Sequence, residues 1–476
     1  MAPPPDDEHS CGWKAYAEQL ATELEAQKKR LDELEQRFLK KSERRRKSSK
    51  LPPPIQRSVP ESERQQTRKR NAEQMASKLE TDTEHIPVPP KHARCCGACG
   101  STDMSRLGAG KPSVRIEFVA AHFRKRVFLR ETLICHNGHI TTAPAPQRMG
   151  EKTQYAPSFV AHLVTSRCRD SMPHARLASA YQSIGLPISR STITALFHRA
   201  AKELKPLHDC ALRLVKCAPD VHADETSIRQ QGQTKRSFVW TFVTNDLTVY
   251  RYATTRSGDV PAQVLGDSQG RLVVDQYTGY NQVTTAGRRT RAGCLAHARR
   301  KLFEQQEHPE VAEALDLIGE IYAIEHRVRD AGMLGTDSHL AARQRESRPI
   351  FARLLCWARR QRGRHDPRSK MGAAIRYILK YHRELGCFLR FASIPPDNNK
   401  AEAALRRIAL SRVNSLFVGN EKAGHNLAVL QTLVMSCHQH GHDPVEYLGD
   451  VLIRVQTHPA KRIEELLPHR WTPPES

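Results

Sequence analysis

Hydrophobic positions near the start of the sequence recur at alternating spacings of four and three residues, from Trp13 to Phe38. Such a heptad places its apolar side chains along one seam of a helix, and we expect this helix to span residues 11–46. A lone helix packed on its own protein would show the same pattern. We favour a short coiled coil that joins chains into a homodimer or higher oligomer, with Gln27 as the polar core position that sets its register.

From Pro219 onward, the apolar positions alternate with a period of two. The runs VHADETSIRQ, SFVWTFVTN and LTVYRYATT predict three consecutive antiparallel strands. Residues 258–265 then predict a crossover helix, RLVVDQY a fourth strand and AGCLA a fifth. This order of elements is that of the ribonuclease-H-like α/β fold, so we expect residues 218–303 to form the first segment of such a core.

Helical spacing of apolar residues dominates most of the remaining chain. Between the predicted fifth strand and the motif PPDNNKAEAALRR, apolar and basic positions follow this spacing, which predicts an all-helical insertion that splits the core. The expected architecture is multidomain α+β. Its predicted regions are a coiled-coil helix (11–46), a basic disordered linker (47–93), a zinc ribbon (94–147), a helical helix-turn-helix-like region (155–212), the first core segment (218–303), the helical insertion (304–392), the second core segment (393–420), C-terminal helices (421–466) and a loose tail (467–476).

Two predicted helices with a break at residues 185–187 resemble a DNA-binding helix-turn-helix. Ser189 or Ser191 would cap the second helix. The first turn of that helix, with Arg190 and Thr192, would then enter the major groove. An ordinary helical hairpin has a similar pattern, so the charge of the chain is needed to favour DNA binding.

The charge indicates a polyanionic partner. Lys and Arg number 75 against 51 Asp and Glu, which gives a formal net charge of +24 and a pI near 9.8. We therefore expect double-stranded DNA as the partner. The basic linker would bind phosphates without reading sequence, although a solubilising linker has the same composition. No apolar run approaches the ~18 residues of a membrane span, so we expect no membrane partner and a cytoplasmic, nucleoid-associated protein.

Grouped cysteines indicate metal binding in a reducing compartment. Two knuckles with strand-like residues between them have the spacing of a zinc ribbon that holds one structural Zn²⁺. Their expected ligands are Cys96, Cys99, Cys135 and His139, with Cys95 and His136 as adjacent alternates. Free thiols are the other interpretation.

Two carboxylates are expected to meet in the predicted sheet. Asp224 lies in the first strand and Asp275 at the end of the fourth, and these strands are neighbours in a ribonuclease-H-like core. Glu402, in a helix predicted to start at Pro395–Asp397, is the best third candidate. Clustered like charges favour a hard divalent cation, so we expect two Mg²⁺ or Mn²⁺ ions. Each acid alone is also explained as a cap or surface charge, and Glu225 should face away from Asp224.

The motifs VHADET, VVDQYTGYN, GCLAHARRKLFE and DNNKAEAALRRIALSRVNSLF occur in this order along the chain. Together they resemble the transposases of the insertion-sequence 66 family, of the TnpC type with an Asp-Asp-Glu catalytic triad. The resemblance covers nearly the whole chain. It implies that the triad is Asp224, Asp275 and Glu402, and that the family block Cys-Trp-Ala-His-x-x-Arg is matched by Cys294, His297 and Arg300.

Some positions depart from the family pattern, although the triad is intact. Leu295 stands where Trp is usual, and Ala403 follows the Glu where Arg is usual. Val413 and Ser415 occupy places that commonly carry Lys and Trp. These departures bear on how DNA ends are positioned.

Several residues are candidates for binding or positioning DNA. Cys294-x2-His297 also looks like half of a metal site, but no second pair lies nearby in the sequence, so packing or substrate contact is favoured over a second Zn²⁺. The full candidate set is Cys294, His297, Arg300, Asn399, Arg406, Arg412, Arg190 and Thr192.

The resemblance implies a DNA transposase. Such an enzyme cleaves at the ends of its insertion sequence and transfers the freed 3′-hydroxyl ends into target DNA, with accessory proteins of the same element as further partners. A catalytically inactive, transposase-derived DNA-binding regulator is the alternative that the departures motivate. A structure-selective nuclease with the same fold and metals is a third interpretation.

Overall fold

The computed structural model describes residues 155–473, together with Phe123, 132–134, 140–142, 148–150 and Thr153. The predicted coiled coil and basic linker lie outside the described residues. The same holds for the predicted zinc ligands Cys96, Cys99, Cys135 and His139 and for the alternates Cys95 and His136, so all of these remain predictions. Inside the predicted zinc ribbon, the described strands β1 (Thr132–Ile134) and β2 (Ile140–Thr142) pair antiparallel.

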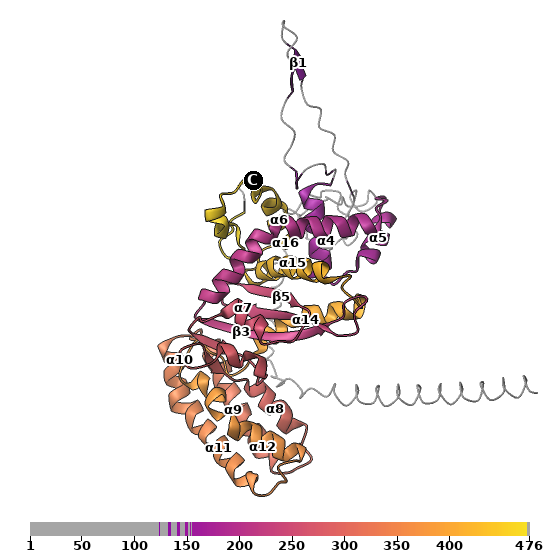
Figure 1. The fold of residues 1–476 in the computed structure, drawn as a ribbon. Helices are drawn as coiled ribbons and strands as arrows, with labels where there is room; N and C mark the ends of the chain where they lie inside the picture. Colours follow the sequence, from indigo (N-terminus) through magenta and orange to yellow (C-terminus); the bar gives the residue numbers. More distant parts are fainter. Residues whose placement is uncertain are drawn as a thin grey trace, which may run out of the picture. The chain divides into compact units, whose positions relative to one another are not determined.

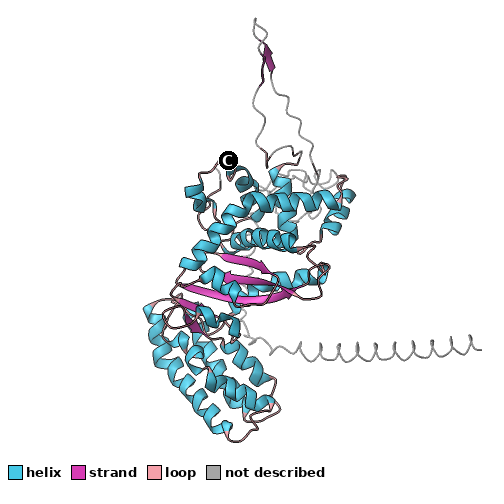
Figure 2. Cartoon of the chain, in the orientation of Figure 1, coloured by secondary structure: helices cyan, strands magenta, loops and turns pink. Residues whose placement is uncertain are grey.

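A five-stranded sheet organises the described region of the chain (Figure 2). Its spatial order is β5-β4-β3-β6-β7, for β3 (Asp220–Ile228), β4 (Ser237–Val243), β5 (Thr248–Ala253), β6 (Arg271–Val273) and β7 (Thr290–Ala292). β3, β4 and β5 are antiparallel neighbours, whereas β6 and β7 run parallel to β3. Three antiparallel strands, a helix and two further strands thus follow one another in the predicted order. The predicted position of the fifth strand, AGCLA, is wrong: β7 ends at Ala292, and Leu295 begins a helix.

Helices cover both faces of this sheet. On one face lies α14 (Asn399–Asn414), where the Tyr250 hydroxyl donates to the Ala404 carbonyl at 2.8 Å. On the other face lie α7 (Asp259–Leu265) and η1 (Thr278–Val283), where the Trp240 and Tyr280 rings meet edge to face at 5.7 Å. Since side chains alternate along a strand, each strand contributes to both cores, and β4 is buried along nearly its whole length.

The free edge of β5 is covered by α15 (Glu421–Gln439). The hydroxyls of Ser436 and Thr432 accept hydrogen bonds from the backbone amides of Thr248 and Tyr250 at 3.1 and 2.9 Å. An uncovered edge strand would expose a row of unpaired amides and carbonyls. Helix α15 therefore supplies side-chain oxygens that accept hydrogen bonds from two amides at this edge of the sheet.

In the described part of the chain, the helices α4 (Pro157–Cys168), α5 (His174–Ser183) and α6 (Arg190–Cys217) precede the sheet. Helices α4 and α6 contact α16 (Pro444–Arg454), α6 also contacts η4 (Ala460–Leu466), and α5 packs on α6. The amide of Thr192 donates to Ser189 Oγ at 3.1 Å, so Ser189 rather than Ser191 caps α6. Helix α6 then continues as one 28-residue helix up to the residues before β3.

Between β7 and α14 the described chain is helical and has its own apolar core around Leu317, Leu354 and Trp357 (Figure 1). The elements are α8 (Leu295–Phe303), α9 (Val311–Asp330), α10 (Asp337–Ala342), η2 (Arg343–Ser347), α11 (Arg348–Arg362), α12 (Lys370–Lys380), α13 (His382–Leu385) and η3 (Cys387–Leu389). No helix in the described ranges is both long enough and apolar enough to cross a bilayer.

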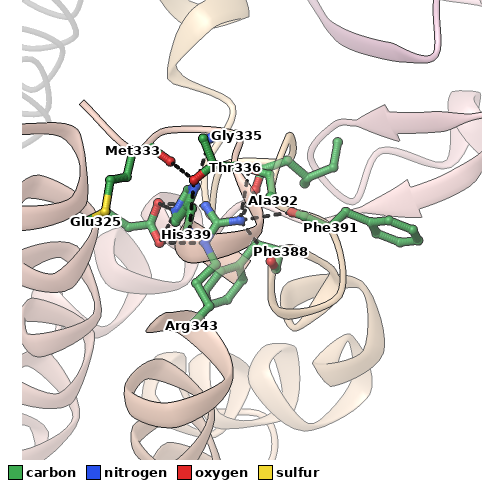
Figure 3. Close-up of polar contacts among 10 residues, drawn as sticks. Glu325, Met333, Gly335, Thr336, His339, Arg343, Phe388, Phe391 and Ala392 are labelled. Atoms are coloured by element: carbon green, nitrogen blue, oxygen red, sulfur yellow. Dashed lines mark hydrogen bonds and ion pairs between the residues drawn. The ribbon is translucent and has the colours of Figure 1, made fainter. Parts of the chain in front are cut away.

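A buried polar network ties this helical segment to the chain that leads into α14 (Figure 3). The Arg343 guanidinium donates to both oxygens of Glu325, at 2.7 and 2.6 Å, and His339 lies 3.2 Å from the same carboxylate. Arg343 also donates, at 2.9 Å each, to the carbonyls of Phe388, Phe391 and Ile394. A buried guanidinium is stable only when paired and fully hydrogen-bonded. Arg343 meets that condition and, in doing so, holds the segment that ends just before Pro395.

Candidate active site

Asp224 lies within β3, and Asp275 follows the end of the neighbouring strand β6. The parallel register of β3 and β6 ends with His222 opposite Val273, so Asp275 lies two residues beyond the last paired residue of β6. The two aspartates interact electrostatically, because the charge of Asp275 contributes to the raised pKa of Asp224. Each aspartate accepts a local backbone hydrogen bond at 2.9 Å, from the amides of Glu225 and Tyr277 respectively. The remaining carboxylate oxygens are thus available at the carboxyl end of β6.

Glu402 lies in the first turn of α14. The helix begins at Asn399, so the predicted start at Pro395–Asp397 is wrong. Pro396 and Asp397 instead form a bend before the helix, and the side chain of Asn398, immediately before Asn399, hydrogen-bonds to β3. The consequence is that Glu402 lies close to the helix N-terminus, where the partial positive charge of the helix favours a carboxylate.

Asn398, which the sequence reasoning missed, joins this helix to the sheet. Its side chain donates to the Ala223 carbonyl at 2.8 Å and lies 3.1 Å from His222 Nδ1, while its own carbonyl accepts from the Glu402 amide at 3.2 Å. Its backbone amide also donates to Cys294 Sγ at 3.3 Å. Asn398 is only 1% exposed. Asparagine just before a helix is a recognisable signal, but nothing local indicates a partner in a distant strand.

The three carboxylates lie within each other's electric field. The pKa of Asp224 is raised to about 7, first by burial, then by the charge of Glu225 and, to a smaller extent, by the charges of Asp275 and Glu402. A group that is neutral up to this pH in the absence of a cation indicates a site with excess negative charge. This electrostatic imbalance is the kind that a bound divalent cation relieves.

Helix α8 presents His297 and Arg300 to Glu402. His297 Nδ1 is 3.7 Å from one oxygen of Glu402, and an Arg300 nitrogen is 3.6 Å from the other. The two residues are three apart, so they share one face of α8. Burial lowers the pKa of His297, and the neighbouring Glu402 opposes that effect. Glu402 is therefore flanked by one imidazole and one guanidinium without a close hydrogen bond to either.

Glu402 also supplies the third donor that the sequence lacked for Cys294 and His297. One ligand atom from each of these three residues lies within 4.8 Å of the others. Two buried atoms here, Glu402 Oε1 and His297 Nδ1, have no hydrogen-bond partner among the described residues. Burial raises the pKa of the Cys294 thiol to about 12, which favours the protonated form. Glu402 is a single third residue and not a second pair, so the preference for packing or substrate contact over a second Zn²⁺ remains a prediction.

Glu225 faces away from Asp224, as strand alternation predicts. Its buried carboxylate accepts from the Tyr280 hydroxyl at 2.6 Å and from Arg256 Nε at 2.8 Å. Arg256 in turn lies over the Tyr277 ring at 4.0 Å. Burial raises the pKa of Glu225, while these two hydrogen bonds act in the opposite direction. Glu225 therefore belongs to a closed network on the α7 face of the sheet.

The remaining candidates for DNA contact are spread over three places. Asn399 and Arg406 are exposed on α14, near Glu402, whereas Arg412 donates to the Ser227 carbonyl and is partly committed to β3. Arg190 is exposed and Thr192 is half-buried in the first turn of α6. The structure thus gathers Cys294, His297, Arg300 and Glu402, and leaves the α6 pair on a separate helix.

The charges of Asp275 and Glu402 both raise the pKa of Asp224, and Glu402 retains a buried oxygen without a hydrogen-bond partner among the described residues. The three carboxylates are not among the described groups whose ligand atoms all lie within 4.8 Å of one another, so a shared cation would need their side chains to move closer. Carboxylate oxygens of this kind are ligands for Mg²⁺ or Mn²⁺.

Two family models match the chain. The one described as "Transposase IS66 family" matches residues 152–426, which is more than half of the chain, and the one described as "IS66 C-terminal element" matches residues 432–469. The first match includes every carboxylate discussed above.

Three relatives from Sinorhizobium fredii are similar over 82% of this chain, and all three are described as uncharacterized proteins. They are y4hP, 28% identical over 75% of its length; y4jD, 29% identical over 81%; and y4qI, 30% identical over 76%.

Proposed function

Because this chain belongs to the IS66 family of transposases, we propose that it cleaves DNA at the ends of an insertion sequence and joins the freed ends to target DNA. Asp224, Asp275 and Glu402 are the proposed catalytic triad. The observation that supports this proposal is the electrostatic coupling of the three acids: the charges of Asp275 and Glu402 both raise the pKa of Asp224, and Asn398 links the helix of Glu402 to β3.

A ribonuclease-H-like core belongs to the proposal. The spatial strand order β5-β4-β3-β6-β7, with three antiparallel strands followed by parallel ones, supports it. In this core β3 is the central strand, and Glu402 approaches from a helix that follows a long helical insertion. The proposed catalytic core therefore consists of two segments that are distant in sequence.

The proposed reaction has two displacements at phosphorus. A water oxygen first attacks the phosphodiester at the element end, and the bond to the departing 3′-oxygen breaks, which leaves a free 3′-hydroxyl. That hydroxyl then loses its proton and attacks a target phosphodiester, the bond from this phosphorus to the target 3′-oxygen breaks, and the departing oxygen takes up a proton as a free 3′-hydroxyl; no covalent protein intermediate forms. Divalent cations held by the triad, Mg²⁺ or Mn²⁺, supply charge stabilisation of the attacked phosphate and activation of the attacking oxygen.

The residues around the triad have supporting roles in this proposal. Arg300 and His297 flank Glu402 at 3.6 and 3.7 Å and orient its carboxylate. Exposed Arg406 and Asn399 on α14 lie where DNA phosphates near the triad would run. Arg190 and Thr192, at the start of α6, are proposed to contact DNA farther from the cleaved bond. Dimerisation through the predicted coiled coil would hold two element ends together.

Cleavage and joining of a labelled element end test this function. In Mg²⁺, the purified full-length chain should give both cleaved and joined products, and chelation with EDTA should abolish both without abolishing DNA binding. Asp275→Asn and Glu402→Gln should each lower cleavage by at least about a hundredfold, because each removes a charged ligand. Asp267→Asn, an 85% exposed site paired with Arg288, is the matched control and should cleave like the parent.

The other outcomes identify the competing functions. Cleavage without joining would indicate a nuclease, and binding without cleavage would indicate a DNA-binding regulator. The regulator has some support from the departures on α14, since Ala403 is exposed and Val413 is 79% exposed where the family usually has Arg and Lys. If Asp275→Asn cleaves as well as the parent, the triad assignment is wrong.

A further inference from the structure

Two histidines and a glutamate from two loops of the helical segment lie close together. They are distant in sequence from the proposed triad residues. His308 and Glu310 lie in the loop between α8 and α9, and His365 lies in the loop after α11. One ligand atom from each of the three residues lies within 4.8 Å of the others. None of them takes part in the proposed reaction.

The contact between His365 and Glu310 does not have the geometry of an ordinary hydrogen bond. Nε2 of His365 is 2.8 Å from Oε1 of Glu310, yet this buried nitrogen has no aligned hydrogen-bond partner among the described residues. The two side chains are only 14% and 29% exposed. These two donor atoms are close together but do not point at each other. Ligand atoms around a common metal ion are arranged in the same way.

The His308 ring completes the arrangement. Its centroid is 5.4 Å from that of His365, and the two planes are nearly perpendicular at 83°. In this edge-to-face arrangement the two rings do not stack over each other, and their nitrogens remain close to the same carboxylate. Two imidazoles and one carboxylate are a common ligand set for Zn²⁺, with water in the fourth position.

Both loops are held by their own hydrogen bonds. In the first, the amides of His308 and Val311 donate to the carbonyls of Gln305 and His308 at 3.1 and 3.0 Å, and Trp357 Nε1 donates to the Glu310 carbonyl at 2.9 Å. In the second, the amide of Arg364 donates to the Gln361 carbonyl at 3.0 Å. The donor atoms are therefore pre-positioned, which lowers the entropy lost when a ligand binds.

We propose that His308, Glu310 and His365 bind one Zn²⁺ ion that fastens the loop after α8 to the loop after α11. It would brace the end of α8, the helix that presents His297 and Arg300 to Glu402, against the remainder of the helical segment. This site is separate from the proposed triad, which has hard carboxylate ligands, and from the predicted zinc ribbon, which has thiolates.

Zinc content of the full-length chain tests the proposal. After chelation and reloading with Zn²⁺, the parent should retain one zinc equivalent per chain more than the double variant His308→Gln/His365→Gln, as measured by mass spectrometry of the metal. The parent should also gain thermal stability on reloading by more than the variant does. The single variant His438→Gln, at an exposed histidine of α15, is the control and should match the parent.

Cobalt distinguishes this site from the predicted ribbon. The difference spectrum between the Co²⁺-loaded parent and the double variant should contain weak visible d–d bands and lack the intense sulfur-to-metal charge-transfer band of thiolate ligation. Glu310→Gln, which keeps the shape of the side chain, should weaken the binding of this ion without unfolding the metal-free protein, as judged by circular dichroism. Equal zinc content and equal stabilisation in the parent and the double variant would overturn the proposal and leave a packed histidine pair.

Discussion

At the scale of single residues, Asp224 is the group whose environment most affects its chemistry. Its pKa of about 7, against 3.8 for an ordinary aspartate, means that the folded protein holds a proton that the unfolded chain has lost. The free energy of unfolding therefore decreases as pH rises between these two values, because the unfolded chain releases this proton more readily than the folded protein does. Burial is the larger cause of the raised pKa, and the charges of the neighbouring acids are the smaller one. The site therefore destabilises the folded protein until a cation binds.

The raised pKa of Asp224 predicts how the substitution Asp224→Asn changes the free energy of unfolding. In EDTA, the variant should be more stable than the parent above pH 7, by up to about 4 kcal/mol at about 1.36 kcal/mol per pKa unit. The difference should disappear as pH falls towards about 3.8. Urea unfolding at several pH values measures it. A parent–variant difference that does not grow with pH would show that the carboxyl group is not buried among like charges.

Replacing Asn398 should lower cleavage more strongly than it lowers the stability of the fold. Asn398→Ala leaves the Ala223 carbonyl and the His222 nitrogen without their partner in a buried place, which should cost about 1–3 kcal/mol. Glu402 would then lose its fixed distance from β3, so cleavage should fall much more than DNA binding. Urea unfolding and a parallel cleavage assay test both effects. The exposed neighbour provides the stability control, since Asn399→Ala should change the free energy of unfolding by less than about 0.5 kcal/mol.

At the scale of elements, a single buried cation orders the stretch that leads from the helical segment into α14. Arg343 is 1% exposed and binds one carboxylate and three carbonyls of the stretch before α14. Such a network orders a segment that has little regular structure of its own. The position of Glu402 thus depends on a residue more than fifty positions earlier in the chain.

Replacing Arg343 by Met should destabilise the protein by about 3–5 kcal/mol, because Glu325 would stay buried without its partner. The matched control is Arg345→Met, at a side chain that is 75% exposed and pairs with Glu346, where the loss should not exceed about 1 kcal/mol. Chemical denaturation of both variants compares them. If the two losses are equal, the buried network does not anchor the segment.

Predicted secondary structure was most accurate where one periodicity extends over many residues. The alternation after Pro219 predicts β3, β4 and β5, and the helical spacing predicts α9, α11 and α12. The start of α14 was wrong, because its capping is determined by Asn398 contacts with β3 and α8 rather than by the prolines before it. Element boundaries depend on such contacts, whereas element types depend mainly on local pattern.

At the scale of the whole molecule, the net charge of +24 predicts strongly salt-dependent DNA binding. A protein that neutralises several phosphates loses about a thousandfold or more in affinity between low and moderate salt, because condensed counterions are released on binding. Titrations of an element end at several salt concentrations should give a steep linear plot of log affinity against log salt. Arg190→Ala should reduce that slope by about one if its guanidinium contacts a phosphate. A shallow slope in the parent would contradict a phosphate-dominated interface.

The sequence by itself determined the order of the strands, the two aspartates of the proposed triad and the membership in a family, because periodicity and motifs are properties of neighbouring residues. Only the tertiary structure decided what surrounds them. Asn398 reaches β3, Arg300 and His297 flank Glu402, and His365 meets Glu310, although each of these pairs is separated by dozens of residues or more. Such contacts arise from the packing of whole helices against the sheet and against one another, and no local pattern records which distant side chains that packing brings together.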